Sequence, residues 1–356
     1  MKKILAIVQH REDRSPGQRF RFEQYMQYLQ QNGYEIIFSN LLSEEDDKIF
    51  YSKGNFMRKL ALMRNFFSHR QKDLKIAKEC DTIYIYREAF FLGTTFFEKR
   101  FAKLGKKIIF DFDDAIWLND TSNANKHFSF LKKPKKTAEI CKLATTVIVG
   151  NKYLADYAKQ FNKNVVIIPT TLNTYSNNCL LWTSKIRKSK VCIGWTGSGT
   201  TTKHFETAIP VLKKIKEKYG NKIYFKVISN QYFKNEVKFK FTQWKIETEN
   251  QELLEFDIGI MPLPDDQWSK GKCGFKGLQC MSLGIPVVMS AVGTNCDIIN
   301  NGKNGFLAST EEQWVEYLSE LIDNQELRQR IGENGKQTVE DKYSFDVWKK
   351  KYLNLF

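Results

Sequence analysis

The stretch GKCGFKGLQCMSLGIPVVMS, residues 271–290, places glycines and two lysines where a predicted helix begins. Gly274 lies between Lys272 and Lys276, and the helix-like segment then leads into a β-branched run. Glycines let backbone N–H groups approach an anion, and a helix N-terminus adds about half a positive charge. The stretch predicts a phosphate-binding turn with Lys276 as a cation, and a solvated surface lysine is the alternative.

A second turn of the same form is IGWTGSGTTTKHF, residues 193–205. A strand leads into Gly197 and Ser198, threonines follow, and Lys203 stands near the start of a helix. The stretch matches neither the Walker loop nor the dinucleotide-binding glycine pattern. Two such turns could hold a diphosphate between them, whereas an ordinary strand-to-helix turn with threonine caps is the alternative for this one.

The first half of the chain offers two further groups after predicted strands. SPGQRFR, residues 15–21, places Gly17 before Arg19 and Arg21 and is a third possible anion contact. FDFDDAIW, residues 110–117, carries three carboxylates: Asp111, Asp113 and Asp114. Carboxylates there could bind a metal, hydrogen-bond sugar hydroxyls or act as a base, and Asp114 could instead cap a helix. Because three neighbouring carboxylates repel one another, at least one is expected to have a partner.

NFMRKLALMRNFFSHRQKDLK, residues 55–75, mixes bulky apolar side chains with cations. The apolar residues recur at helical spacing: Phe56, Leu60, Met63 and Phe67. The cations between them are Arg58, Lys59, Arg64 and Arg70. This pattern suits an amphipathic helix lying on anionic lipid, and equally a helix that packs on the core and has a solvated basic face.

Alternating strands and helices must position these groups. The strand-like runs of the first half are residues 4–8, 34–38, 82–86, 107–111, 146–149 and 165–168, and those of the second half are 191–195, 223–228, 258–261 and 286–289. Strands spaced by helical segments imply βαβ units and parallel sheets. We therefore predict an α/β protein of two Rossmann-like, doubly wound domains facing across a cleft. The expected bounds are 1–172 and 191–340, with a linker at 173–190 and a C-terminal helix at 341–356 that packs back on the first domain.

Composition narrows the function classes. The chain has 356 residues, a formal net charge of +16 and seven cysteines without a C-x-x-C pair. A disulfide framework or zinc site is therefore not expected, and the thiols suit a cytoplasmic protein. No apolar run approaches the ~18–20 residues that cross a bilayer. The charge favours a polyanionic partner, which could be phosphorylated substrates, an anionic membrane surface or nucleic acid, although no nucleic-acid-binding signature is present.

Several motifs, in order and together, resemble the retaining GT-B glycosyltransferases of the "glycosyl transferases group 1" family over nearly the whole chain. FDIGIMPLPDD, GLQCMSLGIPVV and AVGTNCDIINNGKNGFLA, residues 256–266, 277–288 and 291–308, look like successive segments of its donor-binding domain. VIVGNKYLADYAKQF with VVIIPTTLN is similar to the close of its first domain, and KYSFDVWKKKYLNLF to its C-terminal helix.

The resemblance implies transfer of a sugar, with retention, from a nucleotide diphosphate sugar bound mainly to the second domain, and no obligatory metal or other cofactor. The sequence also departs from the family pattern. Gly271 and Gln279 stand where the family has two glutamates, and Trp195 stands where it has a basic residue. Asp113-Asp114 replaces a His-Asp pair, while Asp297 matches the family's acidic residue.

Asp113 and Lys276 are the expected catalytic residues, Asp113 through a contact with the transferred sugar. The expected donor-binding residues are Gly17, Arg19, Gly197, Ser198, Lys203, Gly274, Gln279 and Asp297. We expect a cytoplasmic enzyme, peripheral at the inner face of the membrane, that acts on a cell-surface glycan or lipid-linked acceptor. The alternatives are a catalytically inactive GT-B-like accessory subunit and a nucleic-acid-binding protein.

Overall fold

A computed structural model describes residues 1–52, 54–118, 133, 135–174 and 190–356. These residues form two compact units, Met1–Thr170 with Trp348–Phe356, and Thr171–Val347. Most of the predicted linker, residues 175–189, lies outside the described part of the chain.

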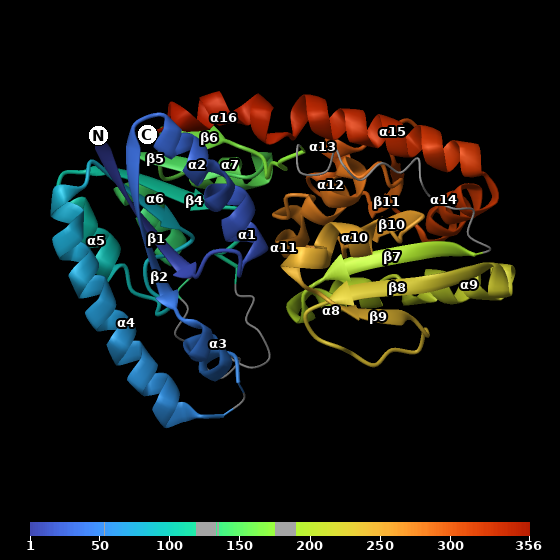
Figure 1. The fold of residues 1–356 in the computed structure, drawn as a ribbon, viewed down its shortest axis with the longest axis horizontal. Coiled ribbons are helices and arrows are strands. Elements are labelled where there is room, and N and C mark those ends of the chain that lie inside the picture. The colour runs from blue at the N-terminus through green and yellow to red at the C-terminus, as the bar shows by residue number, and fades with distance from the viewer. Residues whose placement is uncertain (53, 119–132, 134, 175–189) are drawn as a thin grey trace. The chain divides into compact units, whose positions relative to one another are not determined.

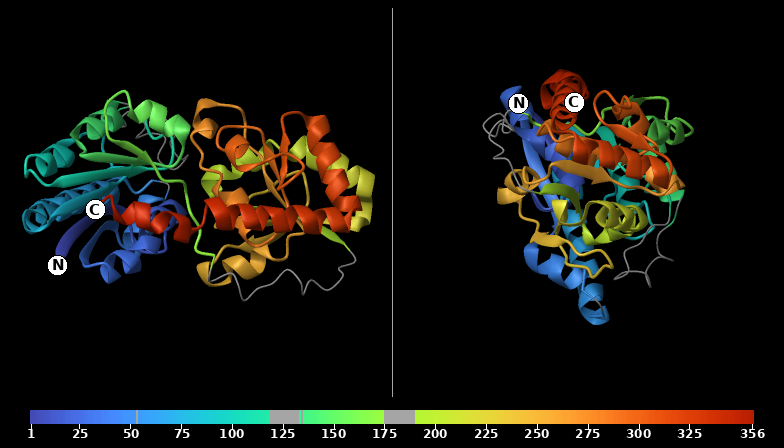
Figure 2. Two further views of the ribbon diagram at one scale, coloured as in Figure 1. Left: turned by 90° about the horizontal axis from the view of Figure 1, so that it is seen from above. Right: turned by 90° about the vertical axis from the view of Figure 1, so that its right-hand side faces the viewer.

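The first unit is built on a parallel six-stranded sheet with the strand order β2-β1-β3-β4-β5-β6. Its strands are β1 (Lys2–His10), β2 (Tyr34–Leu42), β3 (Thr82–Tyr86), β4 (Lys107–Phe112), β5 (Thr146–Val149) and β6 (Val165–Ile167). The run ILAIV at residues 4–8 is fully buried, as expected for a parallel strand with helices on both faces of its sheet (Figure 2). Each such buried Ile or Val contributes about 1.5–3 kcal/mol.

Helices connect these strands (Figure 1). They are α1 (Pro16–Gln18), the π-helix η1 (Arg19–Glu23), α2 (Gln24–Gln31), α3 (Glu44–Phe50), α4 (Phe56–Ile76), η2 (Ala77–Glu79), α5 (Phe96–Ala102), α6 (Lys135–Leu143) and α7 (Lys152–Ala158). The helical segment from residue 19 thus begins as the π-helix η1 and continues as α2, which ends at Gln31, two residues before Gly33 with its φ of +89°. The last helix of the chain, α16 (Phe345–Leu353), returns to this unit, where the rings of Tyr352 and Tyr25 stack at 3.9 Å.

The second unit has its own parallel six-stranded sheet, in the order β12-β11-β10-β7-β8-β9. Its strands are β7 (Val191–Gly197), β8 (Ile223–Ser229), β9 (Lys240–Gln243), β10 (Ile258–Met261), β11 (Val287–Ser290) and β12 (Phe306–Ala308). The two edge strands, β9 and β12, were not predicted. β9 is polar and partly exposed, and β12 has only three residues, so neither carries a clear apolar pattern. The predicted α/β fold class with two doubly wound sheets is confirmed.

The helices of the second unit cover both faces of its sheet (Figure 2). They are η6 (Gly199–Thr201), α8 (Thr202–Glu206), α9 (Ile209–Tyr219), η7 (Gly220–Lys222), η8 (Ile246–Thr248), α10 (Glu249–Leu253), α11 (Gln267–Lys270), α12 (Phe275–Ser282), α13 (Asn295–Ile298), α14 (Glu311–Asp323) and α15 (Gln325–Lys342). The helical stretch over residues 202–219 is interrupted between α8 and α9. Pro210 sits in the first turn of α9, because a proline ring and its missing N–H are tolerated only there.

Two of the lysines and arginines assigned to a basic surface are buried. Arg70 is fully buried in α4 and donates to the backbone oxygens of Ala89 and Val8 at 2.7 and 2.6 Å. Lys59 is buried too and donates to the Ser52 oxygen. Neither contributes to a solvated basic face of α4. The core-facing residues of this helix are Leu62, Phe66, Arg70 and Asp73, with Lys59 near its start.

Candidate functional site

The structure brings the two predicted anion-binding turns of the second unit together. Lys276 lies in the first turn of α12, and its Nζ donates to Thr201 Oγ1 in the turn after β7 at 2.9 Å. The same ammonium group lies 4.7 Å from the ring centre of Trp195, which is itself buried at the end of β7. The family pattern would place a basic residue at position 195, where this chain has Trp195. The ammonium group of Lys276 lies over the Trp195 ring, so a positive charge is nevertheless present beside this position.

Two glycines make room for this arrangement. A Cβ atom on Gly197 would lie 2.3 Å from Trp195 Cη2 and 2.7 Å from Lys276 Nζ, so a larger residue would displace the lysine. Gly274 caps α12 with a φ of +69°, a conformation that favours glycine, and a Cβ there would lie 2.2 Å from Ile298 Cδ1. Both predicted glycines are thus required by close packing around the start of α12.

The turn after β7 differs from the expected anion cradle. The Ser198 N–H donates to Thr201 Oγ1 at 3.1 Å, and the Gly199 N–H donates to Asn230 Oδ1 at 2.8 Å. These amides therefore close the turn on itself. Thr201 Oγ1 also donates to the Ser198 oxygen at 3.0 Å, so one hydroxyl holds both the turn and Lys276.

His204 is a residue of this site that the sequence analysis missed. Its side chain is buried, and its Nε2 atom has no hydrogen-bond partner among the described residues. Burial, together with the positive charges of Lys276, Lys272 and Lys203, lowers the pKa of His204 to about 4. Three positive charges therefore act on one imidazole, which disfavours a further positive charge there. The adjacent letters K-H at positions 203–204 were the available signal.

The other two predicted residues of this unit have different surroundings. Gln279 is buried in α12, yet its side-chain amide makes no hydrogen bond with the described residues, so the amide is available to a ligand. Asp297 is exposed on α13. Burial, with a smaller contribution from the Asp297 charge, raises the pKa of Tyr343 to about 12. The negative charge of Asp297 thus disfavours ionisation of the Tyr343 hydroxyl.

In the first unit, Asp113 follows β4 and is held by hydrogen bonds. Its Oδ1 accepts from Tyr86 Oη at 2.8 Å and from Arg87 Nη2 at 2.7 Å. Burial opposes ionisation of Asp113, but the charges of Arg87 and Arg21 lower its pKa below the ordinary value, so the carboxyl is ionised at neutral pH. A Cβ on Gly17 would lie 2.7 Å from Asp113 Oδ2, so these two predicted residues are brought together.

Arg87 organises this group and was also missed. It directly follows β3 and adopts a φ of +62°, which is uncommon for a residue with a side chain. Besides Asp113, its Nη2 contacts Asp114 Oδ2 at 2.6 Å. Asp114 therefore pairs with a cation and is not the helix cap that the sequence suggested. The sequence signal for this pairing was the position of Arg87 at the end of TIYIYR. The carboxyl ends of parallel strands meet at one edge of a sheet, so Arg87 could be expected near the carboxylates that follow β4.

Arg21 is structural and is not an anion contact. It is buried, and its Nη2 pairs with Asp111 Oδ1 at 2.7 Å, while Tyr84 donates to the other carboxylate oxygen at 2.8 Å. Its neighbour Arg19 lies with its guanidinium carbon 4.4 Å from the ring centre of Phe20. With Arg21 and Arg87 in place, each of Asp111, Asp113 and Asp114 has an arginine partner.

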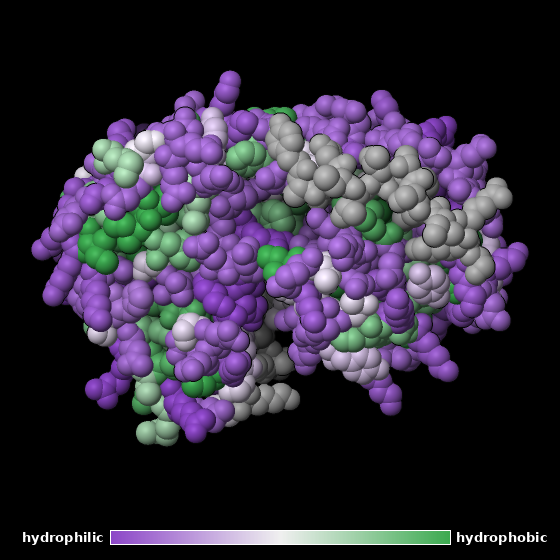
Figure 3. All heavy atoms as spheres, viewed as in Figure 1, coloured by the Kyte–Doolittle hydropathy of each residue, from purple (hydrophilic) through white to green (hydrophobic). Residues whose placement is uncertain are grey.

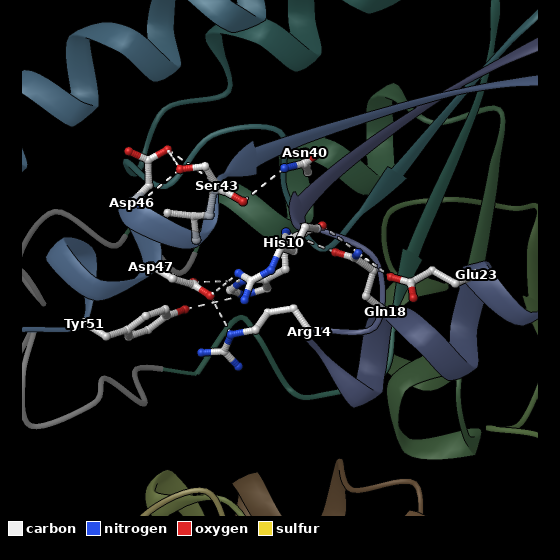
Figure 4. Close-up of polar contacts among 11 residues, drawn as sticks. His10, Arg14, Gln18, Glu23, Asn40, Ser43, Asp46, Asp47 and Tyr51 are labelled. Atoms are coloured by element: carbon white, nitrogen blue, oxygen red, sulfur yellow. Dashed lines mark hydrogen bonds and ion pairs between the residues drawn. The ribbon is translucent and has the colours of Figure 1, made fainter. Parts of the chain in front are cut away.

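A second polar group gathers at the end of β1 (Figure 4). Asp47 in α3 binds Arg14 Nε at 2.5 Å and Arg11 Nη1 at 2.8 Å, and its Oδ1 lies 3.7 Å from His10 Nδ1. Although burial opposes ionisation, the contacts with His10 and Arg14 lower the pKa of Asp47 to about 2. One carboxylate thus fixes two arginines of the loop before α1.

The described residues contain no group of three or more His, Cys, Asp or Glu side chains arranged to hold a metal ion. The three carboxylates considered as metal ligands in the sequence are bound by arginines.

Comparison with known proteins finds relatives for the second unit of the chain. Residues 182–338 match the family model "Glycosyl transferases group 1". A probable sucrose-phosphate synthase of Thermosipho melanesiensis is 33% identical over 82 residues, which is 23% of this chain and 19% of the relative. The capsular polysaccharide biosynthesis glycosyltransferase CapM of Staphylococcus aureus is 30% identical over 76 residues, or 21% of this chain and 20% of the relative. The matches thus span about a fifth of each curated relative.

Solved structures share the fold along the full chain. The sucrose-phosphate synthase of Thermosynechococcus elongatus matches with a TM-score of 0.69 at 12% identity, covering 100% of this chain and 98% of that one. HepE of Anabaena, solved with UDP-glucose, matches with a TM-score of 0.66 at 12% identity, covering 99% and 98%. Residues 182–338 thus resemble the glycosyl transferases group 1 family, and the whole chain shares the GT-B fold of these solved structures.

Proposed function

We propose that this protein is a glycosyltransferase that takes a sugar from a nucleotide diphosphate sugar bound to its second unit and transfers it with retention. The observation that carries the proposal is the position of Lys276. Its ammonium group is held by Thr201 and Trp195 at the start of α12, inside the segment that matches the family model.

A diphosphate leaving group develops negative charge as the bond to the sugar breaks, and fixed cations and N–H dipoles stabilise that charge. In our proposal Lys276 and the N-terminus of α12 supply them, and Lys203 and Lys272 extend the positive region. Gln279 would bind the ribose through its amide, which can donate or accept. Gly197 and Gly274 contribute by leaving space, whereas the amides of the Ser198 turn position Lys276 indirectly.

For the first unit, we propose that Asp113 contacts a hydroxyl of the transferred sugar as an ionised acceptor, with Arg87 and Tyr86 holding it in place. Gly17 would leave space beside that carboxylate. Arg19 and Asp297 remain proposed donor contacts.

Because UDP-glucose occupies the HepE structure, a UDP sugar is the first donor to test. The name of CapM supports a cell-surface glycan or its lipid-linked precursor as the acceptor class, with the enzyme peripheral to the membrane.

The test measures thermal stabilisation by a panel of nucleotide diphosphate sugars, since a ligand of the folded state raises the melting temperature. Lys276→Met keeps the aliphatic stem over Trp195 and removes the charge, so it should abolish stabilisation by the best donor without lowering the melting temperature of the free protein. The matched control is Lys222→Met. Lys222 is exposed and directly precedes the start of β8, whereas the candidate site lies near the end of the neighbouring strand β7. Donor binding by Lys276→Met at wild-type strength would refute the assignment.

One observation favours a second candidate, a catalytically inactive accessory subunit. Gly271 and Gln279 occupy the positions of the family's two donor-loop glutamates. An accessory subunit would give no stabilisation with any nucleotide sugar in the same panel, and no transfer.

A further inference from the structure

One helix of the first unit presents an unusual concentration of exposed apolar side chains. Among the described residues, eight large hydrophobic side chains are exposed, and five of them lie in the segment 51–67: Tyr51, Phe56, Met57, Leu60 and Phe67. Phe56 and Met57 are 61% and 73% exposed. Figure 3 shows apolar surface over the region where Figure 1 places α3 and α4.

A neighbouring face of α4 is fixed to the unit, so the exposed face cannot turn inward. Leu62 and Phe66 are buried, and Arg70 anchors the helix through the Val8 and Ala89 oxygens, while Asp73 of the same helix accepts from Ser39 Oγ at 2.8 Å. Phe56, Leu60 and Phe67 recur at the same spacing as the buried set, but about 100° further round the helix. The apolar stripe predicted from the sequence is therefore present in α4, and most of it faces solvent.

Phe67 connects this stripe to a second aromatic group. Its ring centre lies 5.6 Å from that of Phe96 at the start of α5, and Arg100 lies over the Phe96 ring at 4.2 Å. The apolar surface therefore ends at a cation.

The exposed charges of α4 all have one sign. Its exposed charged residues are Arg58, Arg64, Lys72 and Lys75. The only acidic residue of the helix, Asp73, is buried and bound by Arg70 and Ser39. The exposed carboxylates Glu44 and Glu45 belong to the first turn of α3, which limits the apolar and cationic surface to α4.

We propose that the exposed face of α4 docks the protein on an anionic lipid bilayer. Phe56, Met57 and Leu60 would enter the boundary between headgroups and acyl chains, with Arg58 and Arg64 at the headgroups. An in-plane position follows because no helix among the described residues is long and apolar enough to cross a membrane. A second copy of the chain is disfavoured as the occupant, since two faces with only positive exposed charges repel each other.

This inference rests on the proposed peripheral location, which it assigns to named residues, and is independent of the donor site. The apolar side chains supply non-specific affinity, while each cation near an anionic surface contributes about fivefold. Binding should therefore need both, and should weaken as salt screens the charges.

The experiment is co-sedimentation of the full chain with vesicles of equal parts phosphatidylglycerol and phosphatidylcholine, and with phosphatidylcholine alone. The wild type should bind the anionic vesicles and only weakly the neutral ones. Met57→Ser with Leu60→Ser should weaken binding at least tenfold, and Arg58→Gln with Arg64→Gln roughly twenty-fivefold. The matched controls lie in the second unit: Tyr232→Ser, exposed to the same extent as Phe56, and Lys222→Gln with Lys234→Gln.

Equal binding by the α4 variants and the wild type, or no binding to anionic vesicles, would overturn the inference. A wild-type dimer that becomes monomeric in the Met57→Ser and Leu60→Ser variant would also overturn it, because the face would then be a self-association surface. The α4 variants should keep wild-type thermal stabilisation by the nucleotide sugar. A wild-type protein that is stabilised by the donor but does not bind the anionic vesicles refutes only the docking surface, and vesicle binding without any donor stabilisation refutes only the proposed transferase.

Discussion

Lys276 donates to the hydroxyl of Thr201 at 2.9 Å, across 75 positions of sequence, and this hydrogen bond joins the start of α12 to the turn after β7. The same hydroxyl accepts the Ser198 N–H and donates to the Ser198 oxygen. The position of the cation and the shape of the turn therefore depend on one oxygen atom.

Removal of that hydroxyl should weaken donor binding without unfolding the protein. Thr201→Val keeps the shape and removes three hydrogen bonds, so we expect the Kd for UDP to rise about tenfold, corresponding to roughly 1.4 kcal/mol. Thr201→Ser retains the hydroxyl and should stay within about twofold of the wild type. Isothermal calorimetry with UDP measures both, and equal Kd values for Thr201→Val and wild type would show that the hydroxyl does not position Lys276.

Gly197→Ala should displace Lys276 from the Trp195 ring, because the new Cβ would lie 2.7 Å from Lys276 Nζ and closer still to the indole. Overpacking of this kind lowers the free energy of unfolding by about 1–3 kcal/mol. We expect loss of donor binding together with a lower midpoint in urea. Gly199→Ala is the matched control, since a Cβ there meets the flexible end of Gln231. A Gly197→Ala variant with native binding would mean that the lysine can move without consequence.

Arg87→Met should destabilise the first unit, because it leaves Asp113 and Asp114 without their cation. Breaking such a pair from one side lowers the free energy of unfolding by about 3 kcal/mol. The Asp113 pKa is lowered in the folded state, so the stabilisation is present above the ordinary carboxyl pKa and is lost as pH falls through the folded value. Urea unfolding at neutral pH should show the loss, and the loss should shrink in acid. Arg87→Lys, which keeps the charge but not the bidentate geometry, should be intermediate.

Glu23 should make stability decrease with rising pH. Burial raises its pKa from 4.5 to about 7, despite hydrogen bonds from the Asp13 N–H and from Gln18 (Figure 4). Between those two values the folded chain retains a proton that the unfolded chain has released, so the free energy of unfolding falls over that range and is constant above it. Glu23→Gln should flatten this part of the profile in urea titrations at about pH 5 and about pH 8. A wild-type profile as flat as that of the variant would contradict the shifted pKa.

His204 should gain protons when a diphosphate binds. Its pKa of about 4 reflects burial and the charges of Lys276, Lys272 and Lys203, and a bound anion would offset the charges. We expect NMR titration of the His204 ring, assigned with His204→Gln, to show a higher pKa with UDP than without it. In the free protein the neutral imidazole contributes stability above the ordinary pKa of 6.5, and this stability is lost as pH falls toward 4. An unchanged His204 pKa in saturating UDP would place the diphosphate elsewhere.

The sequence alone determined the two α/β units and the location of their candidate groups. Near-continuous apolar runs such as ILAIV, separated by helical segments, specify buried parallel strands; Gly197 and Asp113 lie at or just after strand ends, and Lys276 lies at the start of a helix between two strands. These are local properties, because burial pattern and turn chemistry are encoded within a few neighbouring residues. The edge strands β9 and β12 lacked that pattern and were missed.

The partners of those groups were decided only by the tertiary structure. Lys276 meets Trp195 and Thr201 because β7 and β10 are neighbours in the sheet, which brings together turns that are far apart in the chain. In the first unit, tertiary packing pairs Asp111 with Arg21 and makes Arg70 a buried anchor of α4. Arg21 and Arg70, which the sequence suggested as surface cations, are therefore buried. A charge keeps its sign in any fold, but its burial and its partners depend on strand order and helix rotation, which no local stretch of sequence contains.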